Sequence, residues 1–231
     1  MKRSILLVLL FLSLVQPVQA EEEDNKKAVA TLIQTTVEKV LKVLGDKKTS
    51  RSTKRERTIK TIEPVIDFQL MAKLTLGRRH WPKFSTKQRE TFTDLLVETL
   101  KVSYFEKLVL FTDEVVEYED PVARGNKFEV VTYIVSKGER TVVVYKLYQR
   151  AGAWRVYDFE IEGVSIVRSY GSQHNDFLRE KSVEKLLEVM KKKVDEARKR
   201  EREKEKKEAG GKGEVEKKPG NKPESAGEHS D

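Results

Sequence analysis

The sequence feature that most constrains the fold is a change of hydrophobic period, from 3.6 residues to 2, in the second half of the chain. Four segments rich in Val, Tyr and Phe are separated by turns that each contain glycine, as in an antiparallel meander: 115–119, 127–136, 139–150 and 154–161. The inner segments are apolar at both alternating positions, whereas a sheet with one solvated face alternates apolar and polar residues. The sequence therefore predicts an antiparallel sheet of about four strands with apolar material against both faces.

Helical periodicity dominates the rest of the chain. Helical segments are expected before the strands, over 24–44, 52–62, 65–81 and 85–110, the third of them interrupted at Gly77 and again before Pro82. Ser85 and Gln88 form a capping-box pattern at the start of the last of these, which is apolar around most of its circumference. A closing helix is expected from about Ser165. This order predicts an α+β fold in which helices flank a twisted antiparallel sheet.

The first 20 residues indicate export. Lys2 and Arg3 precede an apolar run over 5–15, and Ala20 stands before an abrupt acidic stretch, which is typical of a secretory signal peptide. A transmembrane anchor is the alternative, but spanning a bilayer takes about 20 apolar residues and this run is shorter. We therefore expect residues 1–20 to be a signal peptide cleaved after Ala20.

Composition narrows the function. The chain has no cysteine, so disulfides, thiolate zinc sites and a cysteine nucleophile are excluded. Three histidines, with no glycine-rich phosphate loop and no G-x-S-x-G motif, favour a protein that is not an enzyme and has no metal or cofactor. The net charge of +8 favours anionic lipid head groups or acidic partners over nucleic acid in an exported protein, and a merely solubilising charge is the alternative.

The C-terminal residues are not expected to form core. Residues 196–208 are mostly charged and predict a solvated helical extension supported by local ion pairs. Residues 209–231 contain several Gly and Pro and predict a disordered tail. The folded domain is therefore expected to span residues 21–195. The basic C-terminal part either attracts an anionic surface or only solubilises the chain.

Two separated motifs carry a family resemblance. The run 67–77, with 85–89 and Phe92, resembles the central motif of the MlaC-type (toluene-tolerance) phospholipid-binding proteins, and 154–170 resembles their second signature. The resemblance spans roughly residues 28–193. Gly171 stands where the family usually has Arg, and His174 where it usually has Phe. His174 shares a helix face with Tyr170 and is expected to be a partly buried packing residue.

The resemblance implies a periplasmic carrier that shuttles phospholipid between the outer and inner membranes in a lipid-asymmetry pathway. Its partners would be a phospholipid, an inner-membrane ABC lipid transporter complex and an outer-membrane lipoprotein complex, with transient membrane contact and no nucleic acid. The implied fold is loosely like nuclear transport factor 2, with an apolar cavity between sheet and helices. Composition alone favours a solid core over a cavity, and it is the resemblance that favours the cavity. An exported chaperone-like protein and a cavity enzyme are the alternative functions.

Candidate lipid contacts follow from this interpretation, and each has an ordinary core residue as its alternative. From the helices we expect Phe68, Leu70, Met71, Leu74, Leu76, Trp81, Phe92, Leu96, Leu100 and Tyr104 to line the cavity. From the strands we expect Val131, Tyr133, Val143, Tyr145 and Val156. Arg78 and Arg79 are candidates for contact with the head-group phosphate, with a solvated charged pair as the alternative.

Overall fold

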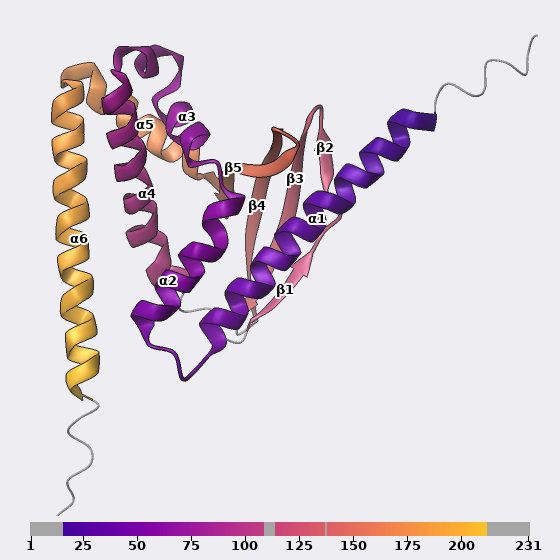
Figure 1. The fold of residues 1–231 in the computed structure, drawn as a ribbon, viewed down its shortest axis with the longest axis horizontal. Helices are drawn as coiled ribbons and strands as arrows, with labels where there is room; N and C mark the ends of the chain where they lie inside the picture. The colour runs from indigo at the N-terminus through magenta and orange to yellow at the C-terminus, as the bar shows by residue number, and fades with distance from the viewer. Residues whose placement is uncertain (1–15, 109–113, 137, 212–231) are drawn as a thin grey trace, which may run out of the picture.

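The computed structural model describes residues 16–108, 114–136 and 138–211, and its elements run in the order helices, strands, helices (Figure 1). The helices are α1 (Gln16–Gly45), α2 (Arg51–Ile62), α3 (Phe68–His80), α4 (Thr86–Leu108), α5 (Ile166–Glu180) and α6 (Val183–Gly211), with 3-10 turns η1 (Glu63–Val65) and η2 (Trp81–Lys83). The strands are β1 (Val115–Tyr118), β2 (Val122–Arg124), β3 (Lys127–Ser136), β4 (Glu139–Arg150), β5 (Ala153–Ile161) and β6 (Val164–Ser165). The predicted α+β class is confirmed.

The sheet is antiparallel, twisted and open, and in the described part of the chain it has six strands rather than about four. Its order is β1-β3-β4-β5-β6, and β2 pairs with the same strand, β3, as β1 does. The additional strands β2 and β6 have three and two residues, which is too short for an alternating pattern to reveal. The four predicted strands lie within a residue of their expected bounds.

Local sequence signals set where the helices begin and end. The Ser85 hydroxyl accepts a hydrogen bond from the Gln88 backbone, and the Gln88 side chain accepts one from the Ser85 backbone N–H, so the predicted capping box is present. Gly77 breaks α3 with φ +62° and ψ −177°, a conformation that favours glycine. The closing helix from Ser165 is two helices, α5 and α6, which are separated at Lys181 and Ser182.

Both ends of the chain continue beyond the described residues. Residues 16–20 of the predicted signal peptide form the first part of α1, and residues 1–15 lie outside the described part. At the other end, α6 continues to Gly211, so residues 209–211 are helical although the sequence predicted a disordered tail from 209. The remaining tail, 212–231, also lies outside the described residues.

The helices gather on one side of the sheet. Figure 1 shows α1 running across the sheet and α4 and α6 lying side by side at the far flank, with α2 between them and the strands. The helical layer meets the sheet through α3 and α5, which pack against β5. By contrast, α4 packs on α3 and α6, and its main contacts do not include the sheet.

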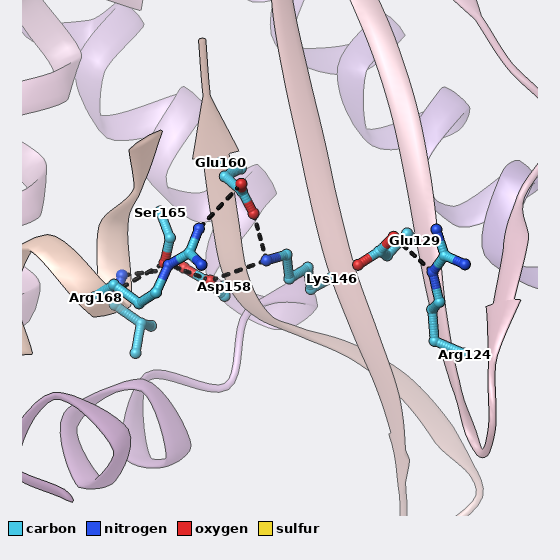
Figure 2. A network of polar contacts seen from close by, with 8 residues as sticks. Arg124, Glu129, Lys146, Asp158, Glu160, Ser165 and Arg168 are labelled. Atoms are coloured by element: carbon cyan, nitrogen blue, oxygen red, sulfur yellow. Dashed lines mark hydrogen bonds and ion pairs between the residues drawn. The ribbon is translucent and has the colours of Figure 1, made fainter. Parts of the chain in front are cut away.

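The second face of the sheet is covered differently from the sequence expectation of apolar material on both sides. It carries Val131, Val142 and Val144, yet none of these joins a buried apolar cluster in the described part of the chain. Charged side chains lie on this face instead, as Figure 2 shows. Lys146 pairs with Glu160 and lies 3.8 Å from Asp158 between Nζ and Oδ2. The Lys146 and Glu160 side chains are only 18% and 19% exposed, and Asp158 is buried, so paired charges rather than apolar side chains occupy this part of the face.

Candidate functional site

The apolar core is divided into two clusters. The helical cluster is formed by α3 to α6 and the residue that follows η2, and its buried members are Met71, Ala72, Leu76, Phe84, Phe92, Leu96, Leu100, Ile166, Leu186 and Met190. The sheet cluster is formed by α1, η1 and one face of the sheet, and its buried members are Val29, Ile33, Val65, Phe128, Val130, Leu147 and Val156. A single solid core would join these sets through fully buried residues, and no residue of either buried set belongs to the other.

Partly buried apolar side chains lie where the two clusters meet. Ile66 and Phe159 pack against both clusters. Phe68, Tyr104 and Ile161 pack against the helical cluster, and Tyr145 packs against the sheet cluster, while all remain partly exposed. We call these six residues the seam. They come from both the helical layer and the sheet, and neither cluster encloses them fully.

Partial burial affects the phenol groups of the two seam tyrosines, Tyr104 and Tyr145, and that of Tyr118, which is 37% exposed and lies outside the seam. Burial raises the pKa of the Tyr104 phenol and of the Tyr145 phenol. Burial, together with Glu38 of α1 and with Tyr145, raises the pKa of Tyr118 to about 12. A raised phenol pKa reports a site that disfavours charge. The surroundings of these tyrosines are therefore better suited to apolar groups than to ions.

The helical candidates mostly belong to the helical cluster. Five of them are buried within it: Met71, Leu76, Phe92, Leu96 and Leu100. Phe68, Trp81 and Tyr104 are partly buried against it. Leu70 is partly buried outside both clusters, and Leu74 is 41% exposed. Among these, Phe68 and Tyr104 belong to the seam, which makes them the helical candidates best placed for a ligand between the layers.

The strand candidates lie on two different faces, so one pocket does not contain them all. Val143 pairs with Ile161 and Tyr145 with Phe159, which places these residues on the face that α1 covers, together with Val156. Val131 pairs with Val144, and Tyr133 pairs with Val142, on the opposite face. The error arises because both phases of β3 and β4 are apolar, and periodicity cannot then assign the inner phase. Phe159 and Ile161 lie on the same face as Val156 because the β4–β5 register shifts between Lys146 and Leu147. Simple alternation from Val156 would have placed them on the opposite face, so no sequence signal identified them.

The remaining candidates, Arg78 and Arg79, and the two surface hollows lie away from the seam. Arg78 and Arg79 are exposed after the break at Gly77, and neither forms an ion pair among the described residues. One surface hollow of about 430 Å³ lies along α2, and another of about 410 Å³ lies between α4 and α6. None of the predicted lipid contacts lines either hollow. The expected apolar cavity is thus neither of these two, and it stays a prediction.

Asp67, in the first motif, holds the sheet to α3. Its buried carboxylate caps α3 by accepting from the Leu70 N–H at 2.9 Å. It also accepts from the Tyr148 hydroxyl and, at 2.8 Å, from Arg150 Nη1, both on β4. Burial alone would raise the pKa of this carboxyl, but these hydrogen bonds outweigh it and hold the pKa below the usual range.

His174 packs as an aromatic ring inside the helical layer, as the sequence predicted. Its ring lies edge-on to Phe92 with 5.1 Å between centroids and 5.9 Å from the Tyr170 ring. Its Nδ1 is buried without a hydrogen-bond partner in the described structure. Nearby on the same helix, Gly171 faces the backbone of Thr75, and a Cβ there would lie 3.4 Å from the Thr75 carbonyl oxygen. The two residues that differ from the family pattern thus both serve the packing of α5.

The fold defines the class first: a mixed α+β domain in which partly buried apolar residues lie where a twisted open sheet meets a helical layer. No helix in the described part of the chain has the length and apolar character needed to cross a membrane. A family model described as MlaC protein matches residues 34–192. Since this match covers more than half of the chain, the protein belongs to the MlaC family.

A solved structure shares this fold. It is that of a phospholipid-binding protein from Ralstonia solanacearum in complex with a phospholipid. The two chains are 21% identical, with a TM-score of 0.67, and the similarity covers 72% of this chain and 97% of the other. No curated protein matches the chain in sequence.

Proposed function

We propose that this protein is a soluble periplasmic carrier that binds a phospholipid by its acyl chains and shuttles it between the outer and inner membranes. The observation that carries the proposal is the divided core, whose seam residues, on or just before α3, on α4 and on the sheet, are apolar and only partly buried. Membership of the MlaC family supports it, and so does the phospholipid bound to the structural neighbour.

The physics of the cargo agrees with such a site. A two-chain phospholipid has about 30 methylenes, and exposing them to water costs on the order of 20 kcal/mol. A soluble carrier must therefore bury the acyl chains against apolar side chains, and the seam supplies these. Because membrane and pocket are similarly apolar, transfer between them is nearly neutral in free energy and needs no covalent step. In this proposal, docking to an inner-membrane ABC lipid transporter complex or an outer-membrane lipoprotein complex sets the direction.

Location follows from the first residues in the same proposal. Residues 1–20 direct export and are removed after Ala20, which leaves the carrier free in the periplasm. Sequencing the N-terminus of protein recovered from the periplasmic fraction tests this step. A mature chain that begins at Glu21 is the expected result, and a retained N-terminus in the membrane fraction would contradict it.

The decisive experiment is solvent extraction of the purified protein followed by mass spectrometry of the extract. We expect a two-chain phospholipid in a stoichiometric amount. Recovery of bound peptides instead would favour a chaperone-like protein. A protein that carries neither and converts a small molecule would favour a cavity enzyme, and both outcomes would reject the carrier.

The head group is tested separately. We propose that Arg78 and Arg79, exposed at the end of α3, contact the phosphate of an anionic lipid through forked hydrogen bonds. Replacing both with Ala should lower the recovery of anionic lipids relative to neutral ones. Lys73→Ala and Lys83→Ala, which remove two exposed cations nearby, are the matched control. An unchanged lipid profile in the arginine variant would show that the pair is only solvated.

A further inference from the structure

Positive charge is concentrated in two segments of the chain. Residues 42–60, which cover the end of α1, the following turn and most of α2, contain eight basic and two acidic residues. Residues 198–204 of α6 contain five basic and two acidic residues. The combined net charge of these segments, +9, exceeds the +8 of the whole chain. The protein is therefore electrically polarised rather than uniformly basic.

The fold brings the two segments together. Arg55 of α2 forms an ion pair with Glu201 of α6, and the two side chains are 20% and 12% exposed. Arg198 pairs with Glu98 of α4 at 2.5 Å between Nη2 and Oε2. Figure 1 shows the α1–α2 connection and the last turns of α6 at the same end of the molecule. The sequence predicted a solvated extension at 196–208, but these contacts fix it against α2 and α4.

This arrangement leaves cations at the surface. Glu201 is directed inward by its pair with Arg55, so it does not neutralise the exposed residues of α6. Lys47, Lys48, Lys60 and Lys199 are exposed and form no ion pair among the described residues. We call the surface formed by residues 42–60 and 198–204 the basic end. It also carries the acidic residues Asp46, Glu56 and Glu203.

We propose that the basic end docks on the surface of an anionic phospholipid bilayer. Neither segment contains a large exposed hydrophobic side chain in the described structure, whereas protein interfaces are anchored by aromatic and apolar residues. Adsorption to an anionic lipid surface needs only flexible Lys and Arg side chains, and each one near the surface raises the partition coefficient about fivefold. The inference rests on the proposed carrier function, since it names the surface by which the carrier meets a membrane.

Vesicle co-sedimentation of the full mature chain tests the proposal. Vesicles of phosphatidylglycerol and phosphatidylethanolamine at low salt should bind the protein, and pure phosphatidylcholine vesicles should not. Substituting Lys47→Gln, Lys48→Gln and Lys60→Gln together should lower the partition coefficient about 100-fold. High salt should abolish binding, because exposed charges are screened within about 3 Å at 1 M salt.

A matched control separates position from net charge. Lys73→Gln, Lys83→Gln and Lys87→Gln also remove three exposed cations, but from α3, η2 and the start of α4, at the opposite end of the molecule (Figure 1). The control should lose less than about fivefold. Equal loss in both variants would overturn the proposal, and so would equal binding to both kinds of vesicle.

Two further outcomes are decisive. A wild-type protein that ignores anionic vesicles but binds polyglutamate would replace the membrane with an acidic protein surface and overturn the proposal. Lipid extraction from the same samples keeps the two proposals apart. Recovered phospholipid without vesicle binding rejects only the docking surface, and vesicle binding without recovered phospholipid rejects only the carrier.

Discussion

Replacing His174 with Phe should remove a loss of stability that the wild-type protein suffers in weak acid. Burial, and secondarily the charge of Lys193 on α6, lower the pKa of His174 from 6.5 to about 4. Because the pKa of His174 is lower in the folded state than in the unfolded state, protonation of His174 favours unfolding. The free energy of unfolding therefore has its full value above pH 6.5 and decreases as the pH falls towards 4. At about pH 5 the loss amounts to about 2 kcal/mol, roughly a 30-fold change in the unfolding equilibrium constant.

The structure indicates that Phe fits the site. His174 already lies edge-on to Phe92, and its buried Nδ1 makes no hydrogen bond in the described structure that Phe would forfeit. Carboxyls with a lowered pKa, such as Asp67, lose their contribution only below the ordinary carboxyl range near pH 4, so they leave the interval from about pH 5 to 7.5 to His174.

Urea unfolding followed by tryptophan fluorescence measures the effect at both ends of that interval. We expect the wild-type free energy of unfolding to fall by about 2 kcal/mol on acidification, and that of His174→Phe to stay within about 0.5 kcal/mol. His174→Leu, which also lacks a titrating group, should follow Phe if it folds. Variants that lose as much stability as the wild type would refute the assignment of a buried neutral histidine.

Three other substitutions test the site and the fold. Ile161→Glu, in the seam, should abolish phospholipid recovery in the extraction assay, whereas Val115→Glu, at a position 64% exposed on the other face, should leave it unchanged. Asp67→Ala should cost about 3 kcal/mol in urea unfolding, because α3 loses its cap and the Tyr148 hydroxyl and Arg150 lose their acceptor; a loss below about 1 kcal/mol would contradict this. Gly77→Ala should cost about 1–3 kcal/mol through the backbone alone, because no atom lies within 4 Å of the added Cβ, and an unchanged denaturation midpoint would contradict it.

Sequence patterns predicted the elements well where one local signal sufficed. Ser50, Asp67, Ser85 and Ser165 each stand at a helix start. Helices α2, α4 and α5 begin within one residue of their expected positions, and α3 begins three residues later than expected. The faces of the sheet were harder. Since β3 and β4 are apolar at both phases, the sequence did not distinguish Val143 and Tyr145, which face α1, from Val131 and Tyr133, which lie among charged residues. Only the pairing of whole strands assigns these faces.

The long-range contacts of the C-terminal extension were missed for a related reason, although its helical character was predicted. A run of mixed charges predicts ion pairs between residues three or four apart, and several of these exist, such as Lys191 with Asp195. The contacts that fix the helix join residues far apart in the chain, Arg198 to Glu98 and Arg55 to Glu201. Such pairs have no period in the sequence. A charged segment therefore looks solvated until the fold supplies its partners.

A carrier that gives up its ligand must stay folded without it, and the divided core offers a way to do so. If one continuous core were built around acyl chains, their release would open a void that costs about 24 cal/mol for each Å³. Here α3 to α6 close the helical cluster and α1 closes the sheet cluster, each with its own fully buried residues. Release of the proposed cargo would then uncover only the seam, whose side chains are already partly exposed. The half-buried state of Phe68, Tyr104 and Phe159 is what the proposed reversible binding of lipid requires of these residues.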